Sequence, residues 1–259
     1  DAIEQQRLSP FAYYGISDGT DLSKLSWRRG RGYDVNELEN VLTADDALTA
    51  DMEQIFLHLA SQNRLPRLNK ALIAPFHLHR AMLDKVEAAS AAAKAGQDAR
   101  IILKMNALTD EPMARALAQA SQQGVKVDLI VRGACILPAQ VPGFTDNVRI
   151  RSVIGRLLEH SRVFYFRTGD AEELWLSSAD WMNRNMLRRI ELAWPVTDSA
   201  LRHRIIDECL LACLHDTRDA WLLQPDGRYV PAGGVAGGRS RTVLHSAQAS
   251  LMARYGSKG

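Results

Sequence analysis

This sequence lacks several features that would assign a chain directly to a particular class of protein. No apolar run approaches the roughly 20 residues of a membrane span, and we expect no signal peptide. Neither GxxxxGK[ST] nor GxGxxG occurs, which excludes the two common glycine-rich phosphate loops. The three cysteines, Cys135, Cys209 and Cys213, form no CxxC pair, and their odd number favours a reducing compartment. A net charge of +2 points to neither nucleic acid nor an anionic membrane.

What is present is ordinary for a soluble globular protein: 259 residues, 46% hydrophobic and 24% charged, enough for one large or two modest domains. The chain begins with Asp rather than Met, so we expect it to begin inside a longer protein. Residues 1–42 show no lasting periodicity. A helix is predicted after Thr49 as N-cap, and the polar stretch SQNRLPRLNK predicts a linker or domain boundary. The apolar face of that helix would be Met52, Ile55, Phe56 and Leu59.

From Ala71 onward, apolar strands alternate with helices. ALIAPF, ARIILKMN and VKVDLIVRG are predicted strands, and the helices between them end at Gly96 and Gly124. Because these strands are almost continuously apolar, the pattern predicts an α/β fold with a mixed, largely parallel sheet covered by helices on both faces. Further strands (NVRIRSV, SRVFYFR, ELWLSS, RRIELAWPV), a long helix capped by Asp198, a glycine-rich linker (PAGGVAGGRSR) and a last helix (TVLHSAQASLMARY) follow.

Polar residues stand where two of the predicted strands end. Lys104 and Asn106 close one strand, and two residues apart on an extended segment they point the same way. Arg132 closes the next, followed by Gly133, which allows a sharp turn. Ligands collect at the carboxyl ends of strands in open α/β sheets, so these basic ends favour an anion site over merely solvated termini.

A second group of polar residues lies between Gly155 and Arg189: His160, the pair Ser177 and Ser178, and Asp180. Eight arginines and five acidic residues lie between Arg149 and Arg189. Histidine, hydroxyl donors and guanidinium forks are the groups that handle phosphate.

Structural roles remain open for several of these residues. A lone histidine such as His160 is more often structural than catalytic. Arg189 and Glu191 are expected to alternate on one strand, where Glu191 either orients or neutralises Arg189. His77 and His79 form an HxH without further metal ligands nearby, so we interpret them as surface helix positions.

Four long stretches of the sequence carry a family resemblance when taken together: ARIILKMNALTD, GVKVDLIVRGACIL, VPGFTDNVRIRSVIGRLLEHSRVFYF and LSSADWMNRNMLRRIEL. Together they strongly resemble the carboxy-terminal part of bacterial polyphosphate kinase of the first type, over about residues 42–259. The resemblance implies a phospholipase-D-like fold, present twice in the full enzyme with the active site between the copies. It divides the chain into a remnant of the preceding copy with a helical linker (1–65), the carboxy-terminal copy (66–225), and a linker with a terminal helix (226–259).

The resemblance also implies roles for individual residues. Arg132 matches a nucleotide-phosphate contact, Arg189 a phosphate-tunnel arginine, and His160 the second copy's histidine, which has acid/base or stabilising roles. Ser177, Ser178 and Asp180 belong to the SSADW signature. The family's phosphorylated histidine lies in the first copy. Aligned against that segment, YGISDGTDLSKLSWR places Lys24 in register but Leu22 where histidine should be, and Tyr33 is the nearest candidate for a nucleotide-contacting tyrosine.

The implied activity is reversible transfer of the terminal phosphate of ATP to inorganic polyphosphate through a phosphohistidine, with Mg²⁺ held by residues outside this chain. The alternatives are a truncated or inactive paralogue that binds nucleotide or polyphosphate without catalysis and, less favoured because Arg162 replaces the lysine of HxK, phosphodiester hydrolysis. Expected partners are ATP, ADP and polyphosphate, with a homo-oligomer in the full-length protein and no nucleic acid. The expected location is the cytoplasm, with peripheral membrane association left open.

Overall fold

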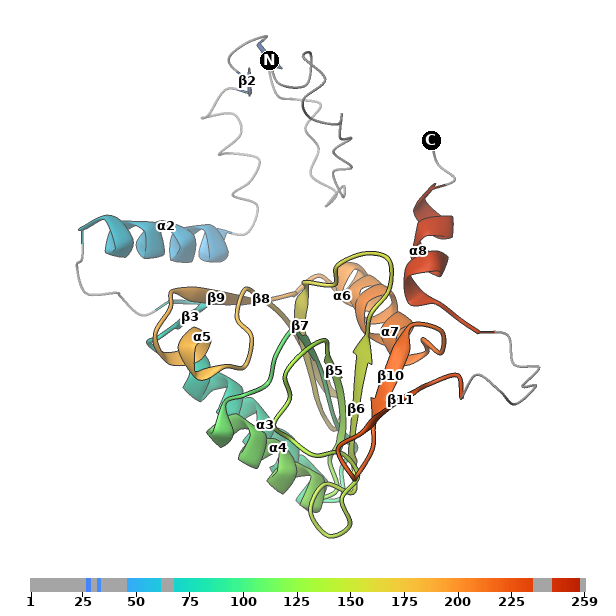
Figure 1. The fold of residues 1–259 in the computed structure, drawn as a ribbon. Helices are drawn as coiled ribbons and strands as arrows, with labels where there is room; N and C mark the ends of the chain where they lie inside the picture. The colour runs from blue at the N-terminus through green and yellow to red at the C-terminus, as the bar shows by residue number, and fades with distance from the viewer. Residues whose placement is uncertain (1–26, 29–31, 34–45, 62–67, 235–243, 257–259) are drawn as a thin grey trace. The chain divides into compact units, whose positions relative to one another are not determined.

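The computed structural model describes residues 27–28, 32–33, 46–61, 68–234 and 244–256 (Figure 1). The chain forms two compact units, Asp1–Asn69 and Lys70–Gly259, which are described separately below. Leu22 and Lys24 lie outside the described residues, and Tyr33 belongs to a strand whose side chains are not described. The match of this region to the first copy's histidine segment therefore stays a prediction.

The first unit contains a two-stranded antiparallel ladder of β1 (Trp27–Arg28) and β2 (Gly32–Tyr33), and the helix α2 (Asp46–Ser61). The prediction of Thr49 as N-cap is wrong, because the residues before it are compatible with helix and α2 already begins at Asp46. Of the expected apolar face, Ile55 is buried, whereas Phe56 is 69% exposed. The apolar spacing thus predicted the helix but not a fully covered face.

The second unit is built on a nine-stranded sheet with the order β11-β10-β6-β5-β4-β7-β8-β9-β3. The central strands β4 and β7 are flanked on one side by β5 and β6 and on the other by β8 and β9. The strands are β3 (Leu72–Ala74), β4 (Ala99–Met105), β5 (Lys126–Val131), β6 (Val148–Val153), β7 (Arg162–Thr168), β8 (Ala171–Ser177), β9 (Glu191–Pro195), β10 (Ala220–Leu223) and β11 (Tyr229–Pro231).

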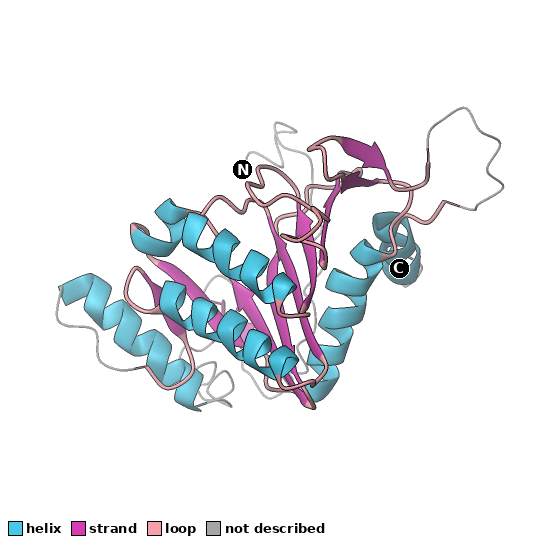
Figure 2. Cartoon of the chain, turned by 90° about the horizontal axis from the view of Figure 1, so that it is seen from below, coloured by secondary structure: helices cyan, strands magenta, loops and turns pink. Residues whose placement is uncertain are grey.

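Helices cover both faces of this sheet, as expected. Helices α3 (Leu78–Lys94) and α4 (Glu111–Gln122) pack side by side on one face, nearest the viewer in Figure 2. The other face carries one continuous helical stretch: α6 (Ser199–Ile205), the π-helix η2 (Ile206–Leu211) and α7 (Ala212–Leu214) (Figure 1). Two shorter elements complete the unit, α5 (Asn183–Leu187) and the terminal helix α8 (Ala247–Gly256).

The α/β class and the mixed sheet are confirmed, but the sheet is not largely parallel. Among the described strands only β4–β5 and β5–β6 pair in parallel, and the remaining ladders are antiparallel. The reason lies in the connections. A helical crossover joins β4 to β5, whereas a tight turn at Gly169 (φ 62°) joins β7 to β8 and imposes a hairpin. The apolar composition of a strand indicates that both of its faces are buried, but it does not indicate whether the strand pairs in parallel or antiparallel.

Acidic residues cap two of the helices, and the cap at Asp198 is the one that the sequence indicated. Asp110 caps α4 by accepting a hydrogen bond from Met113 N at 3.1 Å, with Pro112 in the first turn. Asp198 caps α6 by accepting from Leu201 N at 2.6 Å. The predicted single helix after Asp198 instead widens into the π-helical turn η2. Sequence patterns also missed β10, β11 and α5, which are four, three and five residues long.

Strand β4 lies between the two hydrophobic clusters of the unit. Ile101, Leu103 and Met105 face the cluster under α3 and α4, whereas Ile102 belongs to the cluster under η2 and α7. Each such side chain contributes about 1.5–3 kcal/mol when fully buried, so β4 is a rigid base for whatever follows its carboxyl end. Because β7 runs antiparallel to β4, the end of β4 lies beside the start of β7.

Candidate functional site

Three strands bring their polar ends to one edge of the sheet. Lys104, near the end of β4, pairs with Val163 at the start of β7, and Arg162 pairs with Ser177 at the end of β8. The end of β5 joins them, since Gly133 N donates to Asn106 O at 2.8 Å. A Cβ at position 133 would lie 3.2 Å from that oxygen, which favours glycine there. Both polar groups of the sequence therefore meet at this edge.

Trp181 anchors the loop that follows β8. Its side chain is fully buried and meets the Phe164 ring edge-on, with 5.6 Å between ring centroids. Its carbonyl oxygen accepts hydrogen bonds from Thr109 N and Asp110 N, which ties the loop to the segment after β4. The tryptophan of the SSADW signature thus fixes the position of the preceding residue, Asp180.

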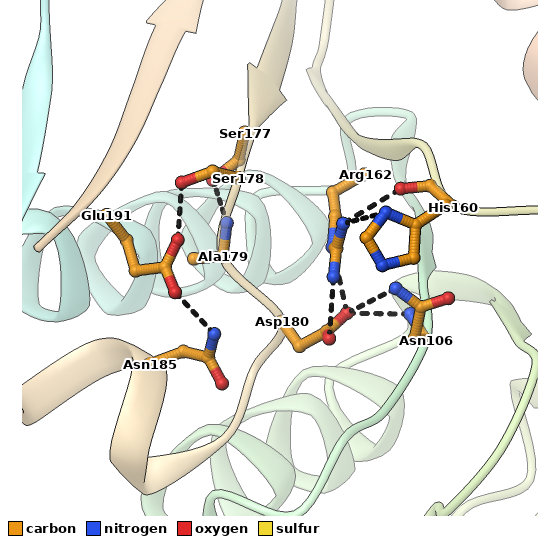
Figure 3. Close-up of polar contacts among 9 residues, drawn as sticks. All are labelled: Asn106, His160, Arg162, Ser177, Ser178, Ala179, Asp180, Asn185 and Glu191. Carbon is orange, nitrogen blue, oxygen red and sulfur yellow. Dashed lines mark hydrogen bonds and ion pairs between the residues drawn. The ribbon is translucent and has the colours of Figure 1, made fainter. Parts of the chain in front are cut away.

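Asp180 is the hub of the site (Figure 3). One carboxylate oxygen accepts from Asn106 N at 2.7 Å, from Asn106 Nδ2 at 3.3 Å and from Arg162 Nε at 3.2 Å. The other accepts from Arg162 Nη2 at 3.0 Å. Because Asp180 is buried and holds Arg162 by two parallel bonds, the guanidinium plane has a fixed orientation.

The remaining guanidinium nitrogen of Arg162, Nη1, fixes the tautomer of the neutral His160 ring. Arg162 Nη1 lies 2.9 Å from both His160 Nδ1 and His160 O (Figure 3). An arginine can only donate, so Nδ1 must accept and the neutral imidazole carries its proton on Nε2. His160 is exposed and lies two residues before β7, which begins at Arg162. The neutral ring of this exposed residue therefore carries its N–H at Nε2.

Lys104 is buried and committed to an ion pair. Its Nζ donates to Glu159 Oε2 at 2.7 Å and lies 3.5 Å from Cys213 Sγ. Burial opposes the charged form of Lys104, but Cys213 and Glu159 outweigh it and raise its pKa. Burial also raises the pKa of the Cys213 thiol, which is then neutral near pH 7, so Glu159 is the effective charged partner. Burial alone would raise the pKa of Glu159, but Lys104 lowers it overall.

Arg132 lines a small pocket together with Lys104, Glu159 and Ser161. Its carbonyl oxygen accepts from the Ser152 hydroxyl at 2.8 Å, which fixes the backbone at the end of β5. The Arg132 side chain is half-buried. It is therefore a cation placed next to the segment that carries His160.

The two serines serve the loop itself. Ser177 Oγ donates to Leu192 O at 2.8 Å and accepts from Ala179 N at 3.0 Å. Ser178 Oγ donates to the buried Glu191 carboxylate (Figure 3) and accepts from Leu192 N. Both hydroxyl groups, which the sequence predicted as hydrogen-bond donors to phosphate, are therefore already engaged in contacts within the protein.

Glu191 does not orient Arg189. Its carboxylate accepts from Ser178 and from Asn185 Nδ2, the latter at 2.6 Å (Figure 3). Arg189 is exposed and precedes β9, which begins at Glu191, so the two do not alternate on one strand. Arg189 instead follows the short helix α5, and its N–H donates to Arg184 O at 3.0 Å before β9 begins.

His77 and His79 are not plain surface positions, because both are half-buried. His77 Nδ1 lies 3.3 Å from Ile73 N, and His79 Nε2 lies 3.0 Å from Asp110 Oδ1, which also caps α4. Their spacing suited a helix surface, but Asp110 arrives from another element and could not be seen in the sequence.

The predicted residues thus divide into two groups. Asn106, Asp180 and His160 form one hydrogen-bonded chain through Arg162, with Lys104 and Arg132 alongside, whereas Ser177, Ser178 and Arg189 belong to the neighbouring loop. Glu159 and Asn185 were not singled out. Glu159 adjoins His160 in sequence, which was the available signal, whereas Asn185 lies on a helix that the sequence did not predict.

The described residues do not fit a magnesium site. Within the ranges given above, no group of three or more His, Cys, Asp or Glu side chains could hold a metal ion. The two carboxylates of the site, Asp180 and Glu159, already accept from Arg162, Asn106 and Lys104. In addition, no helix of the described chain is long and apolar enough to cross a membrane.

The family described as polyphosphate kinase C-terminal domain 2 has a sequence model that matches residues 71–237 of this chain. This chain belongs to the polyphosphate kinase family. It is 43% identical over 215 residues to polyphosphate kinase from Burkholderia vietnamiensis, covering 83% of this chain and 30% of that protein. It is 46% identical over 215 residues to the polyphosphate kinase of Pseudomonas putida, covering 83% of this chain and 29% of that protein.

The crystal structure of polyphosphate kinase from Porphyromonas gingivalis has the same fold over this region. It superposes with a TM-score of 0.74 and 33% identity, covering 82% of this chain and 32% of that one. The chain therefore spans about 30% of the length of the curated polyphosphate kinases it matches. The resemblance drawn from the four sequence stretches is confirmed at the level of the family.

Proposed function

We propose that this chain supplies the supporting, phosphate-binding half of a polyphosphate kinase active site. The full-length protein would transfer the terminal phosphate of ATP reversibly to inorganic polyphosphate. The observation that carries the proposal is the chain of contacts from Asp180 through Arg162 to His160, which leaves the N–H of an exposed imidazole at Nε2. The family membership supports the substrate class.

In this proposal His160 is a proton donor and not the residue that carries the phosphoryl group. With Nδ1 accepting from Arg162 at 2.9 Å, the neutral ring holds its proton on Nε2. A nitrogen that bears a proton has no free lone pair for attack on phosphorus, but it can donate to a phosphoryl or leaving oxygen. The nucleophile would come from another part of the full-length protein.

Arg132 and Arg189 supply positive charge in the same proposal. Charge on a transferring phosphoryl group spreads over its oxygens, and fixed cations stabilise it without reorganising. Arg132 is half-buried beside Lys104 and Glu159, and Arg189 is exposed on the neighbouring loop. Lys104, in contrast, is neutralised by Glu159, so we assign it to holding the loop before His160.

Labelled ATP separates this proposal from its alternatives. The chain alone, incubated with ATP labelled at the terminal phosphate and Mg²⁺, should acquire no acid-labile, base-stable phosphate, yet it should bind inorganic polyphosphate saturably. The full-length protein should acquire such label on a residue outside this chain and make polymer. Label on this chain that disappears in His160→Ala would make His160 the carrier and overturn the assignment.

The binding-only alternative has its own outcome. If the full-length protein binds polyphosphate but neither becomes labelled nor makes polymer, the chain belongs to a binding paralogue. The proposal then fails for catalysis.

A further inference from the structure

The terminal helix α8 is anchored to the sheet by specific polar contacts, although a glycine-rich stretch precedes it. Asp216 is fully buried, and its Oδ2 accepts from Ala247 N at 2.7 Å, at the start of α8. The other oxygen of Asp216 accepts from three backbone N–H groups that lead into β10. Ser246 Oγ donates to Asp219 and accepts from Ala249 N at 3.2 Å, capping the helix. Helix α8 is therefore docked in a defined place.

One residue of α8, Gln248, contacts the segment that carries His160, here called the His160 loop (residues 154–161). Gln248 is 5% exposed. Its Oε1 accepts from Leu157 N at 2.8 Å, and its Nε2 donates to Leu157 O at 2.8 Å and to Glu159 Oε1 at 2.9 Å. The side-chain amide thus pairs with the loop backbone much as a neighbouring strand would.

Polar contacts, and not burial of its own apolar side chains, hold the His160 loop in place. Leu157 is 53% exposed and Leu158 is 74% exposed, so the loop does not bury its own apolar side chains. Glu159 connects the contacts, because one carboxylate oxygen accepts from Gln248 and the other from Lys104. His160 follows directly in the chain.

The loop backbone is also shaped to receive this glutamine. A Cβ at Gly155 would lie 2.5 Å from Gln248 Oε1, closer than real contacts allow. Glycine at this position therefore permits the close approach of helix and loop. Helix α8 lies beyond residues 71–237, which the family model matches.

We propose that α8 is a clamp on the His160 loop and that Gln248 is its positioning residue. Gln248 holds Leu157 and Glu159, and this keeps the His160 ring where Arg162 can donate to Nδ1. The effect of the clamp on phosphate binding rests on the function proposed above, whereas its effect on the loop and on the ring does not.

Two variants test the clamp by different routes. Gln248→Met keeps the length of the side chain and its packing but removes all three hydrogen bonds. Gly155→Ala keeps the glutamine but places a Cβ 2.5 Å from Gln248 Oε1, so the amide and the loop must separate. Gln119→Met, on the exposed face of α4, is the matched control. Circular dichroism melting of each variant establishes that the unit is folded before the loop is measured.

Hydrogen exchange and nitrogen NMR of this chain give the readouts. Both test variants should exchange the Leu157 amide about fivefold to tenfold faster, as expected for one lost hydrogen bond. The imidazole ¹⁵N shifts of His160 should move from the Nε2–H tautomer toward a mixture of tautomers. A role of Gln248 in helix stability alone would leave those ring shifts unchanged. Gln119→Met should match the wild type in both measurements.

The outcomes separate the clamp from the function. Unchanged exchange at Leu157, or unchanged ring shifts of His160 in folded variants, overturns the clamp. If the wild type binds inorganic tripolyphosphate, both test variants should bind it several-fold more weakly, and equal affinity would overturn the link to phosphate. If the wild type does not bind tripolyphosphate, the proposed function fails, and exchange and ring shifts still decide on the clamp.

Discussion

Replacing Asp180 by alanine should destabilise the second unit more than any substitution at an exposed acidic position. The Asp180 and Arg162 side chains are 8% and 11% exposed, so the pair has little solvent to replace a lost partner. Removal of Asp180 leaves a buried guanidinium charge and the Asn106 N–H without their acceptor. Breaking a buried ion pair costs about 3–5 kcal/mol, and we expect about 3 because Arg162 keeps its contacts to His160.

Urea unfolding measures this effect directly. With a slope of roughly 2 kcal/mol per molar urea, the midpoint should fall by about 1.5 M. Asp146→Ala, at an exposed loop position, is the control and should stay within about 0.5 kcal/mol of the wild type. The double variant Asp180→Ala with Arg162→Met should recover part of the loss, because it removes the stranded charge. A loss below about 1 kcal/mol in Asp180→Ala would refute the role of Asp180 as the buried hub.

Two other predictions concern charge. Folding lowers the pKa of Glu159, so its ion pair stabilises fully above the ordinary carboxyl pKa of 4.5 and is lost as the pH falls through the lower, folded value. Glu159→Gln should therefore flatten the acid side of a plot of unfolding free energy against pH, and an unchanged curve would contradict the pairing with Lys104. Polyphosphate affinity should fall as salt rises, because arginine–phosphate contacts are screened. The slope should be shallower in Arg132→Gln and in Arg189→Gln, whereas salt-independent binding would count against both arginines.

The fold was predictable where local chemistry decides it. Asp198 marked a helix start because a short acidic side chain accepts from the first free N–H groups. The apolar run at β4 marked a strand buried on both faces. Strand direction was not predictable, because the turn at Gly169 and the antiparallel pairing of β7 with β4 depend on connections and partners and not on hydrophobicity. The short strands β10 and β11 carried too few residues for a pattern.

The candidate site was predictable as a set of residue types but not as a set of contacts. His160, Asp180 and Asn106 were identified from strand ends and from the resemblance, and Arg162 joins them in space. Which of them stay available to a ligand depends on partners distant in sequence. Gln248 lies 89 residues from Glu159, with which it forms a hydrogen bond, so its role could not be read from spacing.

The most direct test compares two substitutions of His160 in the full-length protein. His160→Asn keeps an oxygen near the Nδ1 position for Arg162 but removes the donor at Nε2, whereas His160→Gln can place an amide N–H near Nε2. We expect polyphosphate synthesis from ATP to fall about 10²–10³-fold in kcat for His160→Asn, with smaller losses for His160→Gln and unchanged stability in both. Synthesis at the wild-type rate by His160→Asn would contradict the central claim that an N–H of His160 acts on phosphate.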